Sequence, residues 1–171
     1  MSNLLVIVAS SRKESDTKKF VQLIFSGEEI DMIDLLDYYI APYDYANNYP
    51  ANDNFLDIAN IITSHDVIVF ATPVYWYAMS GSMKILFDRF TDIVTTKKLV
   101  GRQWKSKSVF LIAVGTDPEI PPGFEIPFKL TAGYLDMHYK EAIYFSTKKE
   151  SIENTVNEKI ESFLRIFKDT E

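Results

Sequence analysis

The sequence predicts an α/β fold in which a five-stranded parallel sheet lies between two layers of helices. Short apolar runs rich in β-branched residues alternate with segments whose apolar residues recur every three or four positions. Such alternation is typical of βαβ units, whose crossovers are almost always right-handed. Five strands covered on both faces fit the sheet order 2-1-3-4-5. Because no repeat or long linker divides the chain, we predict one domain over residues 1–171.

Each element follows from its own local pattern. The expected strands cover residues 4–9, 30–35, 66–72, 108–114 and 142–145, the last being the end of a fifth strand. The expected helices cover about 17–26, 55–62, 83–94, 124–135 and 152–167. The clearest helix has an apolar stripe of Met83, Leu86, Phe87, Phe90, Ile93 and Val94. The same spacing predicts that the last helix turns inward Ile152, Val156, Ile160, Phe163, Leu164 and Phe167.

Composition and charge exclude several classes of function. A net charge of −6 argues against nucleic acid as the main partner, because no basic excess is present to neutralise phosphates. The absence of cysteine excludes disulfides, thiolate metal sites and cysteine nucleophiles, and two histidines are too few for a histidine-rich metal site. We therefore predict no metal. Residues 1–3 lead directly into an apolar strand without a basic region or long apolar segment, so we expect a cytoplasmic protein without a membrane span.

The loop after the first strand has the features of a phosphate site. In residues 10–17, three serines and a threonine supply hydroxyl groups, and Arg12 and Lys13 supply positive charge. The start of the following helix adds free N–H groups and the positive end of the helix dipole. A helix cap with solvated charges is the alternative interpretation, because Ser, Asp and Thr all cap helices well.

The loop after the third strand has the features of a wall for a flat ring. Pro73 ends an apolar strand, and the aromatic cluster Tyr75, Trp76 and Tyr77 follows it. In open α/β sheets, ligands bind beyond the carboxyl ends of the strands, where the loop at Gly115 also opens. The alternative is that these aromatic rings only cap the core. A ligand with a phosphate at one end and a flat ring at the other has the shape of flavin mononucleotide (FMN).

The residues of these loops resemble a known family. Residues 9–17 are similar to the phosphate loop G-S-x-R-x-x-S/G-x-T of flavodoxin-like NAD(P)H-dependent FMN reductases and quinone reductases. Residues 72–84, with Asp88 and Arg89 following, resemble the segment of that family that begins Pro-x-Tyr and continues through Gly-x-x-Lys to Asp-Arg. The resemblance implies a flavodoxin-like three-layer sandwich, bound FMN, NAD(P)H as co-substrate, and a quinone, flavin, azo or nitro compound as acceptor.

The resemblance also implies which residues contact the cofactor. The phosphate would be held by Ser10, Arg12, Ser15 and Thr17, with Asp16 beside them; Pro73, Val74, Tyr75 and Trp76 would line the flavin ring, and Gly115 and Thr116 would close the other side. No catalytic side chain is required, because FMN carries the hydride transfer. Members of the family are commonly dimers, so the resemblance implies a homodimer or a homotetramer.

Two positions depart from the family pattern. Ala9 stands where glycine is frequent, and Asp16 stands where asparagine is frequent, which places a carboxylate beside the phosphate dianion. We expect Asp16 to weaken FMN binding unless it caps the helix or pairs with Lys13 or Lys19. Two other functions stay open: a flavodoxin-type one-electron carrier, and, because of Asp16, a flavin-free interaction or regulatory relative of the same fold.

Other conspicuous residues receive structural interpretations. We expect Arg89 to pair with Asp88, Asp92 or a neighbouring subunit, and His65 and His138 to be structural rather than ligands. The basic residues at 97–98 and 105–107 are expected to be solvated. The tyrosine-rich loop over 36–54 contacts either a second subunit or its own domain.

Overall fold

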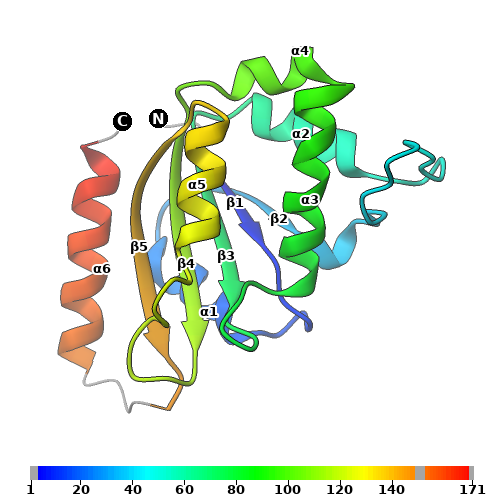
Figure 1. Cartoon of the computed structure of the whole chain (residues 1–171). Coiled ribbons are helices and arrows are strands. Elements are labelled where there is room, and N and C mark those ends of the chain that lie inside the picture. The colour runs from blue at the N-terminus through cyan, green and yellow to red at the C-terminus, as the bar shows by residue number, and fades with distance from the viewer. Residues whose placement is uncertain (1–3, 149–152, 170–171) are drawn as a thin grey trace.

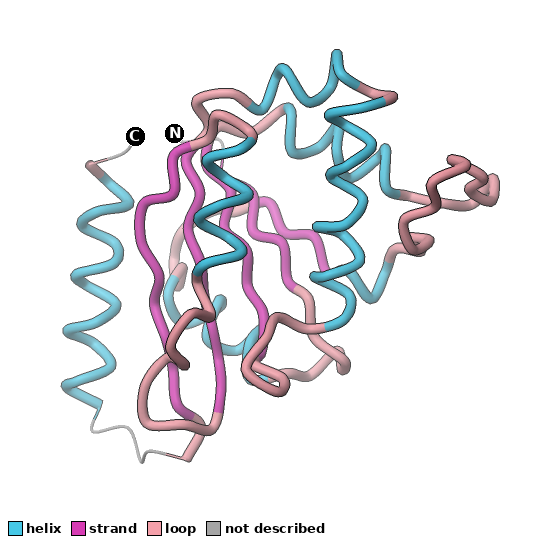
Figure 2. The backbone as a smooth tube through the Cα atoms, in the orientation of Figure 1, coloured by secondary structure: helices cyan, strands magenta, loops and turns pink. Residues whose placement is uncertain are grey.

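The predicted sheet and its strand order are confirmed by the computed structural model, which describes residues 4–148 and 153–169, the side chains of 153–156 excepted. The strands are β1 (Leu4–Val8), β2 (Asp31–Asp34), β3 (Val67–Pro73), β4 (Ser108–Gly115) and β5 (His138–Ser146). They form one sheet of order β2-β1-β3-β4-β5 in which every neighbouring pair is parallel. Figures 1 and 2 show this sheet at the centre of the molecule, with helices on both of its faces.

The helices cover the two faces unequally. They are α1 (Asp16–Ile24), α2 (Phe55–Thr63), α3 (Gly81–Thr95), α4 (Lys98–Gly101), α5 (Ile126–Tyr134) and α6 (Glu153–Lys168), with short 3-10 turns at Leu35–Asp37 and Arg102–Trp104. Alternate residues of β1 serve two cores: Leu5 and Ile7 pack with α2, α3 and α5, whereas Val6 and Val8 pack with α1 and α6. This alternation follows from the two-residue period of a strand, and it explains why β1 has to be apolar throughout.

Two features of the fold were not predicted. The run at 142–145 is the end of a fifth strand, as expected, but the strand already begins at His138, and its first half alternates between exposed and half-buried residues. Helix α4 and the turn after it were not predicted, because a four-residue helix has too few positions to show a period. Ile160, Phe163 and Phe167 of the last helix are buried as predicted, whereas Ile152 and the side chain of Val156 lie outside the described residues.

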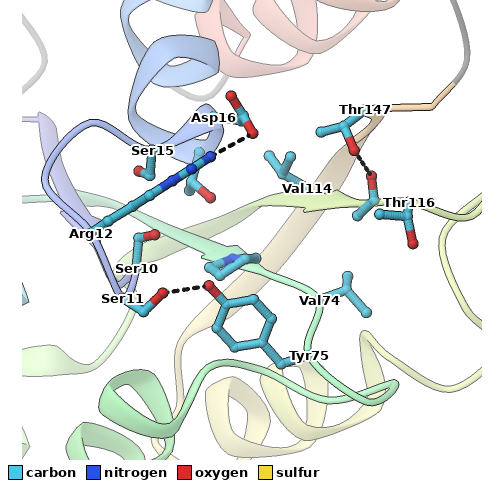
Figure 3. Close-up of a pocket in the computed structure, with 13 residues that line it drawn as sticks. Ser10, Ser11, Arg12, Ser15, Asp16, Val74, Tyr75, Val114, Thr116 and Thr147 are labelled. Atoms are coloured by element: carbon cyan, nitrogen blue, oxygen red, sulfur yellow. Dashed lines mark hydrogen bonds and ion pairs between the residues drawn. The ribbon is translucent and has the colours of Figure 1, made fainter.

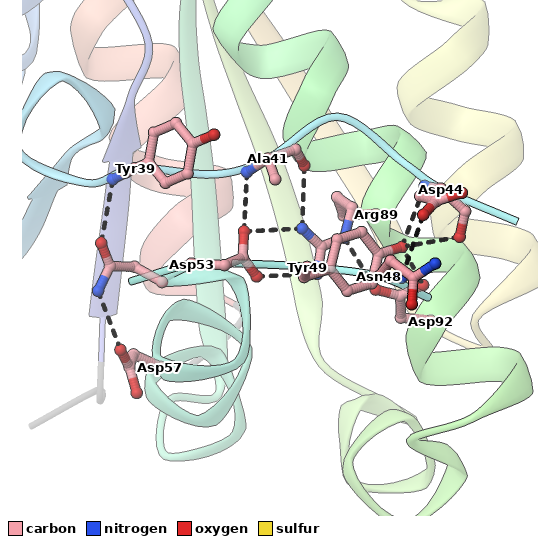
Figure 4. Close-up of polar contacts among 10 residues, drawn as sticks. Tyr39, Ala41, Asp44, Asn48, Tyr49, Asp53, Asp57, Arg89 and Asp92 are labelled. Atoms are coloured by element: carbon pink, nitrogen blue, oxygen red, sulfur yellow. Dashed lines mark hydrogen bonds and ion pairs between the residues drawn. The ribbon is translucent and has the colours of Figure 1, made fainter. Parts of the chain in front are cut away.

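A buried arginine fastens the long loop to α3 (Figure 4). The guanidinium of Arg89 donates to both carboxylate oxygens of Asp53 at 2.8 and 3.0 Å, to Asp92 at 2.8 Å and to the carbonyl of Ala41 at 2.9 Å. Its carbon Cζ lies 3.5 Å from the centre of the Tyr49 ring. Burial disfavours the charge, but the hydrogen bonds to Asp53 and Asp92 outweigh it and raise the pKa of Arg89. The loop is thus held against its own domain.

These contacts correct part of the sequence interpretation. Arg89 does pair with Asp92, but its second carboxylate is Asp53, and Asp88 pairs instead with Lys84. Tyr45 remains 90% exposed and contacts the ring of Tyr43, so the loop carries both a tyrosine packed on Arg89 and an exposed one.

The end of the sheet that carries the amino termini of the strands holds a second polar cluster. His65 is buried, as a structural residue at the end of α2, with Nδ1 2.7 Å from the carbonyl of Ile61 and Nε2 2.9 Å from Asp31. Lys107 is buried rather than solvated, because its ammonium donates to the carbonyls of Thr63 and His65. Burial lowers the pKa of Lys107. Among the helices that the structure describes, none combines the length and apolar character that a membrane crossing requires.

Candidate functional site

A cavity of about 310 Å³ lies at the carboxyl ends of β1, β3 and β4 (Figure 3). It is lined by Ser10, Ser11, Arg12, Ser15, Asp16, Thr17, Pro73, Val74, Tyr75, Val114, Gly115, Thr116 and Thr147. The fold therefore brings together all of the predicted cofactor-binding residues except Trp76. Three further residues, Ser11, Val114 and Thr147, were not predicted.

One end of the cavity is built by the start of α1. Ser15 precedes the helix, and its Oγ accepts a hydrogen bond from the backbone N–H of Lys18 at 3.2 Å. Ser10 and Thr17 are buried at the same end, and in the described part of the chain their hydroxyl groups have no hydrogen-bond partner. Hydroxyl groups beside a helix N-terminus are suited to bind an anionic group.

The positive charge of this loop is already paired with carboxylates. Arg12 lies 3.1 Å from Asp16, and Lys19 lies 3.5 Å from the other oxygen of the same carboxylate. Lys13 instead pairs with Asp34 and Asp37, and the hydrogen bond to Asp37 raises its pKa. The excess of positive charge expected here from the sequence is therefore offset. Asp16 pairs with Lys19, one of the two partners expected from the sequence, and also with Arg12, which was not expected as a partner.

The loop after β3 closes the opposite side. The N–H of Val74 donates to the carbonyl of Val114 at 2.7 Å, so this loop starts as an extension of the sheet. Tyr75 then points back across the cavity, and its hydroxyl lies 2.8 Å from Oγ of Ser11. Figure 3 shows this contact joining the two loops at the cavity rim. Ser80 adds a second link between the β1 and β3 loops, because its Oγ donates to the carbonyl of Ala9 at 2.9 Å.

Trp76 lies outside this cavity. It is 94% exposed, at the tip of a tight turn between Tyr75 and Ala78. It lines a separate cavity of about 190 Å³ together with Val74, Tyr77, Thr116 and Asp117. The sequence placed Trp76 beside Tyr75 because the two are neighbours in the chain, but the turn directs them to different spaces.

The third wall depends on a glycine. A Cβ added at Gly115 would lie 2.6 Å from the Tyr144 hydroxyl, so β5 leaves room for glycine alone at this point. That hydroxyl donates to the carbonyl of Asp117 at 2.9 Å, and Thr147 donates to the carbonyl of Gly115 through both its N–H and its Oγ. Burial raises the pKa of Tyr144. This wall is thus held by Tyr144 of β5 and by Thr147 directly after it, in a part of the chain with no sequence motif for a site.

The donor set fits a phosphorylated, ring-containing ligand. Hydroxyl groups and the α1 N-terminus occupy one end, and Pro73, Val74, Val114 and Thr116 offer flat, largely apolar walls at the other. Asp16 is the one carboxylate that lines the cavity, and its two basic partners offset its charge.

Similarity to known proteins identifies the family of this chain. A model of the NADPH-dependent FMN reductase family matches residues 2–151. YwqN of Bacillus subtilis (strain 168), named as an NAD(P)H-dependent FMN-containing oxidoreductase, is 27% identical over 121 residues, 67% of each chain. KefG of Cronobacter sakazakii, named as an ancillary protein of a glutathione-regulated potassium-efflux system, is 33% identical over 119 residues, 58% of this chain and 61% of KefG.

Solved structures show the same fold. The Trp repressor binding protein of Bacillus subtilis has a TM-score of 0.72 at 21% identity, and the match covers 95% of this chain and 99% of that one. Because the family match spans most of the sequence, this chain belongs to the NADPH-dependent FMN reductase family, as an oxidoreductase with FMN as cofactor and NAD(P)H as co-substrate.

Proposed function

We propose that this protein transfers a hydride from NAD(P)H to bound FMN and then reduces a small aromatic acceptor, namely a quinone, a flavin, an azo compound or a nitro compound. The observation that supports this best is the single cavity in which the hydroxyl-rich start of α1 faces the loops after β3 and β4. One continuous cavity supports the proposal because a single FMN molecule has to reach both the phosphate end and the ring end.

At the phosphate end, Ser10, Ser15 and Thr17 would hold the FMN phosphate with their hydroxyl groups and the first N–H groups of α1. Arg12 would contact the phosphate from the cavity rim, where its side chain is 65% exposed and free to turn away from Asp16. Asp16 would then keep Lys19 as its partner. Binding would thus exchange one ion pair for another, which makes it dependent on salt.

At the ring end, Pro73, Val74 and Tyr75 would lie against one side of the flavin, and Gly115 and Thr116 against the other. Bound FMN supplies the hydride chemistry, so the residues of the chain orient the ring and exclude water rather than move protons. The residues that line the cavity include no histidine, which is consistent with that division of labour.

We further propose that residues 1–171 form one domain that assembles as a homodimer or a homotetramer.

The test combines a spectrum with an assay. Purified protein is saturated with FMN and dialysed, its visible absorbance is recorded, and oxidation of NADH and of NADPH is then followed with menadione as acceptor. We expect about one retained FMN per chain and menadione-dependent oxidation, and no oxidation by protein freed of FMN. Protein that retains FMN but leaves both nucleotides unoxidised would contradict the proposal, and accumulation of a one-electron-reduced flavin on reductive titration would favour the carrier alternative.

A further inference from the structure

The turn that carries Trp76 and Tyr77 has an unfavourable backbone conformation and exposes two aromatic rings to water. Both residues have positive φ angles, 49° and 64°, in a two-residue turn of the kind that favours glycine and asparagine. Bulky side chains in this region of backbone conformation are strained, and such strain is frequent at ligand sites. In addition, Trp76 is 94% and Tyr77 69% exposed, so two large rings are left in water.

The exposed rings border a small cavity beside the candidate cofactor site. The cavity of about 190 Å³ is lined by Val74, Trp76, Tyr77, Thr116 and Asp117. Val74 and Thr116 also line the larger cavity, so the two spaces share a wall. A ring that enters the smaller cavity would therefore lie next to the position proposed for the flavin ring.

The charge of this cavity is negative. Asp117 is its one carboxylate, and none of its five lining residues is basic. The backbone of Asp117 is fixed, because its carbonyl accepts the hydrogen bond from the Tyr144 hydroxyl at 2.9 Å. The faces of Trp76 and Tyr77 also attract cations and repel anions, since an aromatic ring is electron-rich on its face. The aromatic faces of Trp76 and Tyr77 and the carboxylate of Asp117 thus all favour cationic over anionic ligands.

We propose that Trp76, Tyr77, Thr116 and Asp117 form the subsite for the second ring, the nicotinamide or the acceptor, and that Asp117 makes this subsite select neutral or cationic flat rings over anionic ones. The inference rests on the proposed function for the identity of the reaction. The charge preference belongs to the chain itself, so it can be measured without turnover.

The binding test uses Trp76 as its own reporter. The chain has two tryptophans, and Trp104 is fully buried in the core, so a soluble quencher reaches Trp76 selectively. FMN-loaded protein and protein freed of FMN are each titrated with 1-methylnicotinamide, a cationic ring that quenches indole fluorescence, and with nicotinate, its anionic counterpart. We expect saturable quenching by the cation, at least threefold weaker binding of nicotinate, and loss of the saturable signal in Trp76→Phe.

The variant Asp117→Asn tests the charge. Glu119→Gln is the matched control, because this substitution removes the same unit of charge at an exposed residue that lines neither cavity. We expect Asp117→Asn to bring nicotinate to within twofold of the affinity of 1-methylnicotinamide, and Glu119→Gln to leave the preference unchanged. One charge at contact distance in a water-exposed site corresponds to about a threefold to tenfold effect.

A kinetic comparison connects the subsite to the reaction. The ratio of kcat/KM for 1,2-naphthoquinone and its 4-sulfonate should fall about threefold to tenfold in Asp117→Asn and stay constant in Glu119→Gln. The inference would be overturned by an unchanged ratio of kcat/KM or by equal binding of 1-methylnicotinamide and nicotinate. It would also be overturned if acrylamide, a soluble quencher, did not quench Trp76 in the absence of ligand. Charge-selective binding without turnover would instead contradict only the proposed function.

Discussion

The hydroxyl oxygens of Ser11 and Tyr75 lie 2.8 Å apart and join two loops that are 64 residues apart in the sequence. Ser11 follows β1 and contributes to the wall next to the start of α1, whereas Tyr75 follows β3 and contributes to the opposite wall. The shape of the candidate cofactor cavity thus depends on a contact that neither loop makes by itself.

Removing this contact should weaken cofactor binding. We expect Ser11→Ala and Tyr75→Phe each to raise the Kd for FMN about twofold to tenfold, because one hydrogen bond contributes about 0.5–1.5 kcal/mol. The double variant should lose no more than either single one, since the two residues share one bond. Quenching of FMN fluorescence measures the Kd, and Tyr45→Phe is the control, because Tyr45 is 90% exposed and lines neither cavity.

Asp16 should limit the affinity for FMN. Its carboxylate lines the cavity beside the proposed phosphate position and is 40% exposed. We expect Asp16→Asn to lower the Kd for FMN about threefold to tenfold at low salt, because the variant removes a like charge and frees Arg12. The gain should shrink in 0.5 M salt. Glu14→Gln, an exposed position in the same loop, should have little effect, and weaker FMN binding by Asp16→Asn would show that the carboxylate supports the site.

Arg89 should be a main support of the long loop. We expect Arg89→Met to lower the free energy of unfolding by about 3–5 kcal/mol, because it leaves the buried carboxylate of Asp92 and the half-buried carboxylate of Asp53 without their cation. The matched control is Lys84→Met on the same helix, where the ion pair with Asp88 is exposed and should contribute at most about 1 kcal/mol. Urea unfolding followed by far-UV circular dichroism compares the two, and equal losses would contradict this assignment.

Replacing Gly115 with alanine should require the side chain of Tyr144 to move. Since a Cβ would lie 2.6 Å from the Tyr144 hydroxyl, we expect Gly115→Ala to destabilise the fold by about 1–3 kcal/mol. Tyr144→Phe alone should cost about 1 kcal/mol through the lost bond to the carbonyl of Asp117. The double variant should lose less than the two costs combined. Thermal unfolding measures all three variants, and strict additivity would mean that the hydroxyl is not the obstacle.

Tyr139 should make the protein less stable at high pH. Burial, followed by the hydrogen bond to Glu125, raises the pKa of its hydroxyl. Above pH about 10 the unfolded chain therefore releases a proton that the native state keeps, and the free energy of unfolding falls as the pH rises. Urea unfolding at pH 9 and pH 11 should show a smaller decline in Tyr139→Phe than in the unmodified protein. Equal declines would mean that other groups account for the alkaline loss.

The sequence was sufficient for features that depend on neighbours along the chain. The apolar stripe from Met83 to Val94 predicted α3, and the runs at 66–72 and 108–114 predicted two central strands, because a buried strand or helix face repeats with a fixed period. The sheet order followed as well, since parallel strands joined by right-handed crossovers allow few arrangements. Ser10, Thr17 and Pro73 could be assigned to one edge for the same reason.

Only the tertiary structure decided which side chains meet across that edge. Thr147 contributes to the candidate site from the loop directly after β5, Asp53 reaches Arg89 from a loop, and Trp76 turns away from the cavity that Tyr75 lines. Contacts of this kind join residues that are far apart in the sequence, or depend on one backbone turn, and they leave no periodic signal. The sequence by itself determined the fold, the family and the sheet edge at which the candidate site lies, because these depend on local pattern. The pairing of charges and the direction of each ring depend instead on packing in three dimensions.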